Sequence, residues 1–269
     1  QLNIGFDFNM FDSKLQSSFD WYNKTTKDWL IKAPVLLTAG APAPWSNGGA
    51  VSNKGIEVSF KWTDKISDFK YSITATMGMN KNEVTQINNS EKIIHGDKNS
   101  LWQGAPESYR AEVGHPIGYF WGYKTVSLLR SDEDITAYVN DMRSSAESYA
   151  ASINKKPTYD AFITAKKLSK GELRFQDLNK DGLINDKDRT QIGDPNAKFT
   201  FGLQLYFEYK NFDLQLVGVG KAGHQILMSY SSASDRLREN ITYDYFNKAY
   251  DETRNPGGTM PKITSVPNT

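Results

Sequence analysis

One short segment of the sequence has the residue types and the spacing of a metal-binding loop. Oxygen donors stand at its positions 1, 3, 5, 7 and 12. The candidate ligands are the side chains of Asp177, Asn179, Asp181 and Asp188 and the backbone carbonyl of Leu183. Gly182 occupies position 6, where such a loop must turn sharply. Because Ca²⁺ takes about six to eight oxygen ligands, the spacing predicts a structural calcium site.

The last position of this loop departs from the usual EF-hand pattern. EF-hand loops end with Glu, whereas this loop ends with Asp188, as in the calcium loops of dockerins, which it resembles. The shorter side chain makes ligation through both carboxylate oxygens harder. A turn rich in Asp, Asn and Gly that binds no metal is the alternative interpretation.

The other residues whose side chains could take part in catalysis form no catalytic pattern. The three histidines, His95, His115 and His224, are far apart in the sequence, and there is no cysteine. No zinc-protease, nucleophile-elbow or phosphate-loop motif is present in the sequence. We therefore expect a protein that is not an enzyme.

Charge and hydropathy exclude two further classes of protein. The 32 basic and 31 acidic residues nearly cancel, so no basic field favours nucleic acid. The mean hydropathy is −0.59, and no apolar run approaches the roughly 18 residues of a membrane-spanning helix. A membrane strand needs apolar residues only at alternate positions, so a barrel is still possible.

Alternation of apolar and polar residues predicts six strands in three hairpins, the first of which begins with Ile4, Phe6 and Phe8 on one face. The strands are expected near residues 2–11, 15–23, 55–63, 69–79, 198–209 and 212–220. The turns within the hairpins are short, and the long loops are residues 23–54, 79–198 and 221–269. Transmembrane barrels alternate short turns and long outer loops in this way.

Two folds are compatible with the alternation. In a barrel the apolar face meets lipid, whereas in a soluble sandwich it is buried against a second sheet. Loops beyond about 15 residues are uncommon in compact soluble domains, which favours an all-β, antiparallel transmembrane barrel segment. Closed barrels need at least about eight strands, so we expect a fragment. The alternative is a soluble, calcium-stabilised β-sandwich module that binds carbohydrate.

A small helical insertion is expected in the longest loop, within residues 128–151. Ser131 is a typical N-cap, and Asp132 and Glu133 give an acidic first turn. Tyr138 and Met142 fall on one face of this helix, which we expect to pack on the loop around it.

Four segments in order resemble the SusC/RagA family of TonB-dependent outer-membrane transporters. They are residues 51–57, 114–123, 177–189 and 192–203. The resemblance implies a barrel of about 22 strands, of which this chain lacks the plug domain and the final strands. It also implies a SusD-like surface lipoprotein, energy delivered by TonB through the plug, and import of glycan oligomers or peptides. The location would be the outer membrane of a Gram-negative bacterium, with the long loops outside the cell.

Aromatic residues in the predicted outer loops are candidates for sugar contact, because the C–H faces of sugars stack on aromatic rings. The candidates are Trp45, Trp102, Trp121 and Tyr123. Packing within the loops is the alternative role for each of them.

Overall fold

The computed structural model describes residues 1–32, 40, 44–98, 100–101, 105–161, 163, 168–228 and 242–263. The sequence predicts one domain, whereas the structure divides the chain into two compact units. Unit 1 comprises Gln1–Gly96, Tyr109–Phe120 and Gly193–Leu227. Unit 2 comprises Asp97–Ser108, Trp121–Ile192 and Met228–Thr269.

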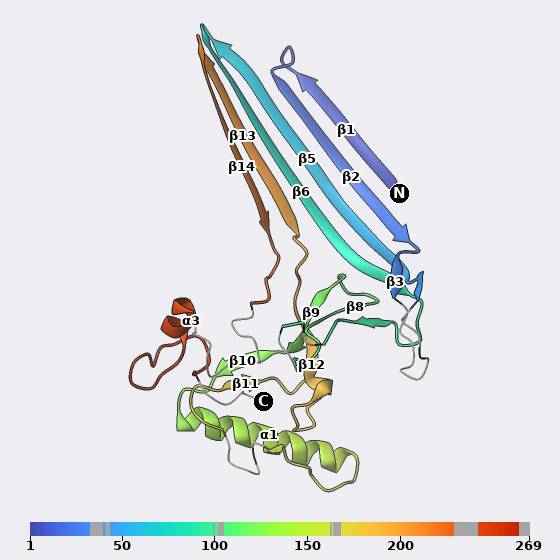
Figure 1. Cartoon of the computed structure of the whole chain (residues 1–269), viewed down its shortest axis with the longest axis vertical. Coiled ribbons are helices and arrows are strands. Elements are labelled where there is room, and N and C mark those ends of the chain that lie inside the picture. Colours follow the sequence, from blue (N-terminus) through green and yellow to red (C-terminus); the bar gives the residue numbers. More distant parts are fainter. Residues whose placement is uncertain are drawn as a thin grey trace. The chain divides into compact units, whose positions relative to one another are not determined.

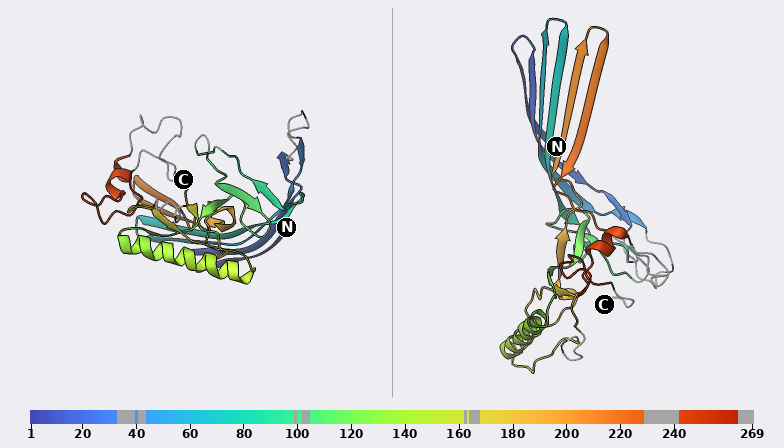
Figure 2. Two further views of the ribbon diagram at one scale, coloured as in Figure 1. Left: turned by 90° about the horizontal axis from the view of Figure 1, so that it is seen from below. Right: turned by 90° about the vertical axis from the view of Figure 1, so that its left-hand side faces the viewer.

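A six-stranded antiparallel sheet makes up most of unit 1 (Figure 1). Its strands are, in order across the sheet, β1 (Leu2–Met10), β2 (Leu15–Lys27), β5 (Gly49–Ile66), β6 (Phe69–Ile87), β13 (Phe199–Tyr209) and β14 (Phe212–Ala222). Seen along its strands, the sheet is curved (Figure 2). The three predicted hairpins and the antiparallel all-β fold are confirmed.

Tight turns close the three hairpins. Ser67 lies between β5 and β6 and has a φ of 55°, and Lys210 lies between β13 and β14 with a φ of 53°. The left-handed region is accessible to such residues singly, and it reverses the chain within a few residues. Consecutive strands therefore pair directly, and the long connections run only between hairpins.

The strands extend beyond the ends that alternation predicts. Lys27 of β2 pairs with Ala50, and Gly49 of β5 pairs with Ile87 of β6, so parts of the predicted loops 23–54 and 79–198 are strand. The amphipathic pattern stops near Lys54 and Asn80, but backbone N–H and C=O groups continue to pair. Pairing between strands needs only these backbone groups, so a strand can continue beyond the segment in which apolar and polar side chains alternate.

Shorter strands and a small core complete unit 1. Strand β3 (Leu30–Lys32) pairs with β4 (Trp45–Asn47), and β7 (Ile93–His95) pairs with β8 (Tyr109–Glu112). The start of β9 (Tyr119–Tyr123) pairs with β8. The buried core residues are Val51, Val84, Ile87 and Ala111.

Unit 2 is built around the predicted helix, α1 (Asp132–Ser152). The Ser131 side chain accepts the N–H of Asp134, and the Asp134 carboxylate accepts the N–H of Ser131, which confirms the predicted N-cap. Tyr138 and Met142 are buried against Leu129, as expected for the inner face of the helix. Among the described residues, no helix is both long and apolar enough to cross a membrane.

Five further described elements belong wholly or largely to unit 2. Strands β10 (Thr125–Leu128) and β11 (Leu173–Phe175) pair with each other, and β12 (Arg189–Gly193) lies beside β9. A single 3₁₀ turn, Asp186–Asp188, precedes β12. Helix α3 (Tyr243–Lys248) is short and is capped by Thr242.

Candidate functional site

The two faces of the six-stranded sheet differ in chemistry. One face carries large apolar side chains that are exposed: Phe8 is 53%, Phe60 40% and Phe201 54% exposed. Others on this face are Leu2, Ile4, Phe6, Met10, Met77, Leu203, Leu214 and Leu216. A β-sandwich would bury this face, so the structure does not support the sandwich alternative. An apolar surface of this extent needs an apolar partner, and lipid is the one that a barrel offers.

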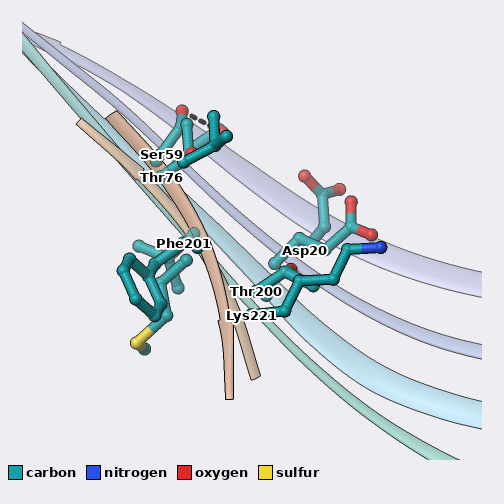
Figure 3. A pocket seen from close by; sticks show the side chains of 14 residues that line it. Asp20, Ser59, Thr76, Thr200, Phe201 and Lys221 are labelled. Atoms are coloured by element: carbon teal, nitrogen blue, oxygen red, sulfur yellow. Dashed lines mark hydrogen bonds between the residues drawn. The ribbon is translucent and has the colours of Figure 1, made fainter. Parts of the chain in front are cut away.

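The opposite face of the sheet is polar and hollowed. Small residues such as Gly78 and Thr200 floor a hollow of about 600 Å³. Figure 3 shows Asp20, Thr200 and Lys221 projecting to this side and Phe201 to the other. The hollow exists because glycine and hydroxyl side chains leave space that longer side chains would fill.

Charged residues lie at the two sides of this hollow. In the strand register, Asp20 of β2 lies opposite Glu57 of β5, so two carboxylates are neighbours on this face. Lys221 of β14 lies opposite Thr200 of β13. Like charges opposite each other are unfavourable unless water or a cation screens them. Neither carboxylate forms an ion pair within the part of the chain that the structure describes. The polar face is therefore suited to contact with water and polar solutes, and not to packing in a hydrophobic core.

Aromatic side chains gather at the end of the sheet where the short turns lie. The Phe69 and Phe207 rings are stacked with centroids 6.0 Å apart. At the neighbouring turn, the ring centroids of Phe11 and Trp62 are 6.2 Å apart. Such girdles mark the level at which a barrel strand leaves the hydrocarbon and enters the interface.

The predicted metal-binding loop turns back on itself within unit 2. Lys180 and Gly182 have positive φ angles of 57° and 78°, which turn the backbone inward twice. Asp177 accepts the N–H of Gly182 at 2.8 Å. Asn179 Oδ1 accepts the N–H of Asp181 at 3.0 Å. The oxygen donors of alternate residues therefore lie on the inner side of the turn.

Asp188 closes the loop from its far end. Its carboxylate is fully buried, and its two oxygens accept the N–H groups of Leu178 and Asn185, each at 2.9 Å. Asn185 in turn caps the 3₁₀ turn that follows. The short Asp side chain thus joins position 12 of the loop to positions 2 and 9.

The donor types of this loop fit a hard cation. Asp181 is 7% exposed and Asp188 is fully buried, and no described lysine or arginine forms an ion pair with either or with Asp177. Burial raises the pKa of Asp177, and the nearby charges of Asp188 and Asp181 add to this rise. Buried carboxylates are costly without a compensating cation.

The carboxylates alone do not make a ready metal centre. Among the described residues, no three His, Asp or Glu side chains are arranged to hold a metal. The Asn179 amide oxygen and the Leu183 carbonyl would have to complete the ligand set. The Asn179 amide nitrogen also donates to Asp181 Oδ2 at 2.9 Å, so both side chains already contact each other.

Without calcium, we expect Asp177 to contribute stability to unit 2 that grows as the pH falls from neutrality toward the ordinary pKa of a carboxylate. The raised pKa of Asp177 means that the folded state binds more protons than the unfolded state. This stability is present at low pH and is lost as the pH rises through the folded-state pKa. Thermal unfolding in a calcium chelator, followed by the circular dichroism of helix α1 at several pH values, measures this stability. Asp134 and Asp251 have lowered pKa values and act in the opposite direction, so the test is the difference in stability between the wild type and Asp177→Asn. A difference that does not grow in favour of the wild type as the pH falls would contradict the assignment.

The aromatic candidates for sugar contact are divided between the two units. Trp45 is on β4 in unit 1 and is 64% exposed, whereas Trp121 and Tyr123 are half-buried on β9 in unit 2. The Tyr123 ring centroid lies 5.5 Å from that of Phe175. The guanidinium carbon of Arg189 lies over the Tyr123 ring, 5.0 Å from its centroid. Packing explains Tyr123, and Trp102 lies outside the described residues.

The histidines stay apart, as their spacing predicts. His95 Nε2 lies 3.2 Å from Glu91 Oε2, and the His115 ring stacks on Tyr119 with centroids 4.7 Å apart. His224 follows β14. These side chains form no shared catalytic or metal-binding group.

The exposed apolar face, the polar hollow and the aromatic end together define a wall segment of an antiparallel, membrane-spanning β-barrel. In sequence, the chain is 29% identical to TonB-dependent receptor P3 of Formosa agariphila over 229 residues, 84% of this chain and 20% of the relative. It is 24% identical to TonB-dependent receptor SusC of Bacteroides thetaiotaomicron over 259 residues, 93% of this chain and 22% of SusC. The chain thus spans about a fifth of the length of these relatives.

In fold, the chain is similar to the RagAB peptide transporter, with a TM-score of 0.65 and 18% identity over 98% of this chain and 26% of that chain. The RagAB peptide importer in its open-open state gives a TM-score of 0.64 at 17% identity. No protein-family model matches the chain. The resemblance to SusC/RagA-type TonB-dependent transporters that the four sequence segments predict is confirmed.

Proposed function

We propose that this chain is a wall and outer-loop segment of an outer-membrane importer that is driven through TonB. The observation that carries the proposal is the six-stranded sheet with one exposed apolar face and one hollowed polar face. In this role, outer-membrane lipid contacts Phe8, Phe60 and Phe201, and the polar face lines an aqueous lumen. The chain contributes contacts and shape to transport, not bond-breaking chemistry.

The cargo would be an oligomeric nutrient, either a glycan or a peptide. RagAB is a peptide transporter, and SusC is a TonB-dependent receptor. A SusD-like lipoprotein would cover the outer loops, and a plug domain would connect the barrel to TonB in a Gram-negative cell. The polar hollow, with carboxylates on one side and Lys221 on the other, supports passage of polar cargo.

Isolation from the source bacterium tests this function. A tagged form of the protein should appear in the detergent-extracted outer membrane together with a surface lipoprotein. Cells that lack it should lose growth on one class of oligomer while growing normally on the monomer. Recovery in the soluble fraction without a lipoprotein would contradict the proposal.

We further propose that the loop of residues 177–188 binds one Ca²⁺ and that the ion has a structural role. Support comes from the alternate oxygen donors, the two left-handed residues and the buried carboxylates, which have no basic partner among the residues that the structure describes. Asp177, Asn179, Asp181 and Asp188 would hold the ion with the carbonyl of Leu183. A bound cation would offset both the burial and the nearby charges of Asp188 and Asp181, which together raise the pKa of Asp177.

Titration calorimetry with CaCl₂ tests the calcium proposal. The chain should bind one ion, and Asp181→Asn should weaken binding at least about tenfold because it removes a negative ligand. Asp186→Asn is the matched control. Asp186 lies in the same loop, but its side chain is exposed and pairs with Arg189, so calcium affinity should change little. No binding heat at millimolar CaCl₂, or equal losses in the two variants, would refute the site.

A further inference from the structure

Residues 113–119 form a turn, here called the strap, that lies on the polar face of the sheet. It contacts β5 and β6 near the end remote from their short turn at Ser67. Two glycines shape it: Gly114 has a φ of 89° and Gly118 a φ of 71°. The residues between them are His115, Pro116 and Ile117. The strap is part of a segment that resembles the transporter family, yet the proposed function assigns it no role.

Backbone hydrogen bonds join the strap to β6. The N–H of Gly114 donates to the carbonyl of Val84 at 2.8 Å. The N–H of Val84 donates to the carbonyl of His115 at 2.9 Å. The start of the strap therefore pairs with the outer part of β6 as a short extra strand would.

Two asparagines bind the backbone in the middle of the strap. Asn82 Oδ1 accepts the N–H of Ile117 at 2.8 Å, and Asn196 Nδ2 donates to the carbonyl of Ile117 at 2.9 Å. Asn82 comes from β6, whereas Asn196 comes from the turn before β13. Both backbone groups of one residue are thus bound by side chains from two separate segments.

Each asparagine is itself fixed by further hydrogen bonds. Asn82 Nδ2 donates to Asn53 Oδ1 at 3.0 Å on the neighbouring strand β5. The backbone N–H and the side-chain amide of Asn196 both donate to Asp194 Oδ1 at 2.9 Å. Asp194 is tied through its own N–H to Gln225 Oε1 at 2.8 Å. Rotation of either asparagine side chain away from Ile117 would also break its amide hydrogen bond, to Asn53 for Asn82 and to Asp194 for Asn196.

Apolar packing fixes the strap from beneath. Ile117 packs on the core of Val51, Val84 and Ile87, in which Val84 and Ile87 are fully buried. Tyr119 is also fully buried, and its hydroxyl donates to Glu112 Oε2 at 2.5 Å. Lifting the strap would therefore expose apolar surface as well as break hydrogen bonds.

We propose that the strap is a fixed ledge, latched by Asn82 and Asn196, and not a gate that opens. The strap covers part of the polar face about 14 Å from the hollow, measured along β6 away from the short turn at Ser67. This distance follows because Asn82 is four residues beyond Gly78 and a strand rises about 3.4 Å per residue. Cargo that moves along this wall passes beside the strap. The rigidity follows from the contacts alone, while the role as a constriction rests on the proposed transport function.

Hydrogen–deuterium exchange of the full chain in detergent micelles tests the latch. In the wild type, the amides of Gly114 and Ile117 should exchange at least about 100-fold more slowly than an unstructured peptide. Asn82→Ala and Asn196→Ala should each accelerate exchange in the strap about tenfold, and the double variant should accelerate it further. Asn9→Ala is the matched control, because Asn9 is exposed on the same face and far from the strap.

The outcomes separate a ledge from a gate. Strap amides that exchange in the wild type as fast as an exposed turn would show a mobile gate and overturn the proposal. Equal exchange in wild type and double variant would overturn the latch. Protection of β5 and β6 in the same experiment reports whether each variant folds, and Asn196→Ala alters no strand residue of the sheet. None of these results depends on transport, so a failed uptake assay leaves them interpretable.

Discussion

Arginine in place of Leu203 is expected to lower the free energy of unfolding from a lipid bilayer by about 2–4 kcal/mol. Leu203 lies on β13 on the apolar face and is 47% exposed. If this face meets lipid, the guanidinium must enter hydrocarbon or distort the bilayer to reach water. If the face met water, the same change would cost little.

The neighbouring residue supplies the matched control. Gln204 is the next residue of β13 and therefore points to the polar face. Gln204→Arg should change the free energy of unfolding by no more than about 0.5 kcal/mol. Denaturant titration of both variants in lipid vesicles measures the difference. Equal costs at the two positions would mean that the faces do not meet different solvents.

Alanine in place of Gly182 is expected to destabilise unit 2 by about 2–5 kcal/mol, from left-handed strain and from overpacking together. Gly182 has a φ of 78° and packs against helix α1. An added Cβ would lie 2.5 Å from the Ala146 Cβ and 2.6 Å from the Met142 carbonyl oxygen. Helix backbone cannot move aside as a flexible side chain can, so the loop or the helix must shift.

Gly118→Ala separates the two causes. Gly118 has a φ of 71°, but an added Cβ there meets no atom within 4 Å. Its cost should be backbone strain alone, about 1–2 kcal/mol. Chemical unfolding followed by helix circular dichroism and by exchange of the α1 amides measures the Gly182 variant. Exchange of the β6 amides measures the loss in Gly118→Ala, because Gly118 lies in unit 1. A loss no greater than that of Gly118→Ala would show that the loop does not press on α1.

The local parts of the fold follow from the sequence because local rules decide them. Alternation around Phe6, Phe60 and Phe201 gives the strands and their apolar face. Short polar turns give the hairpins, and Ser131 with Asp134 gives the start of α1. Alternation does not reveal the solvent on the apolar side, and the length of the loops supplied that preference.

Pairings between hairpins could not be predicted from the sequence. Asp20 and Glu57 meet because β2 pairs with β5, yet a long connection separates these strands, and no turn geometry sets their register. The hollow and the latch of Asn82 and Asn196 on Ile117 depend on such non-local pairings. The division into two units is likewise a product of tertiary contacts.

The candidate metal loop was predictable in shape but not in every detail. The spacing from Asp177 to Asp188 correctly predicts the turning backbone with Gly182 in the left-handed region. It does not reveal that Asp188 also caps the 3₁₀ turn and binds the N–H of Leu178. Aromatic residue type alone could not separate Tyr123, which packs on Phe175, from the exposed Trp45.

The central claim, that this sheet is a barrel wall with lipid on its apolar side, can be tested by spin labelling. The chain has no cysteine, so single labels can be placed at adjacent positions on the two faces: Asp7 and Phe8, Lys61 and Phe60, Thr200 and Phe201. In lipid bilayers we expect labels at the three phenylalanine positions to collide with oxygen, which partitions into lipid. Labels at their neighbours should collide with a water-soluble nickel chelate. Accessibility to the chelate at Phe8, Phe60 and Phe201, or no alternation between neighbours, would contradict the account.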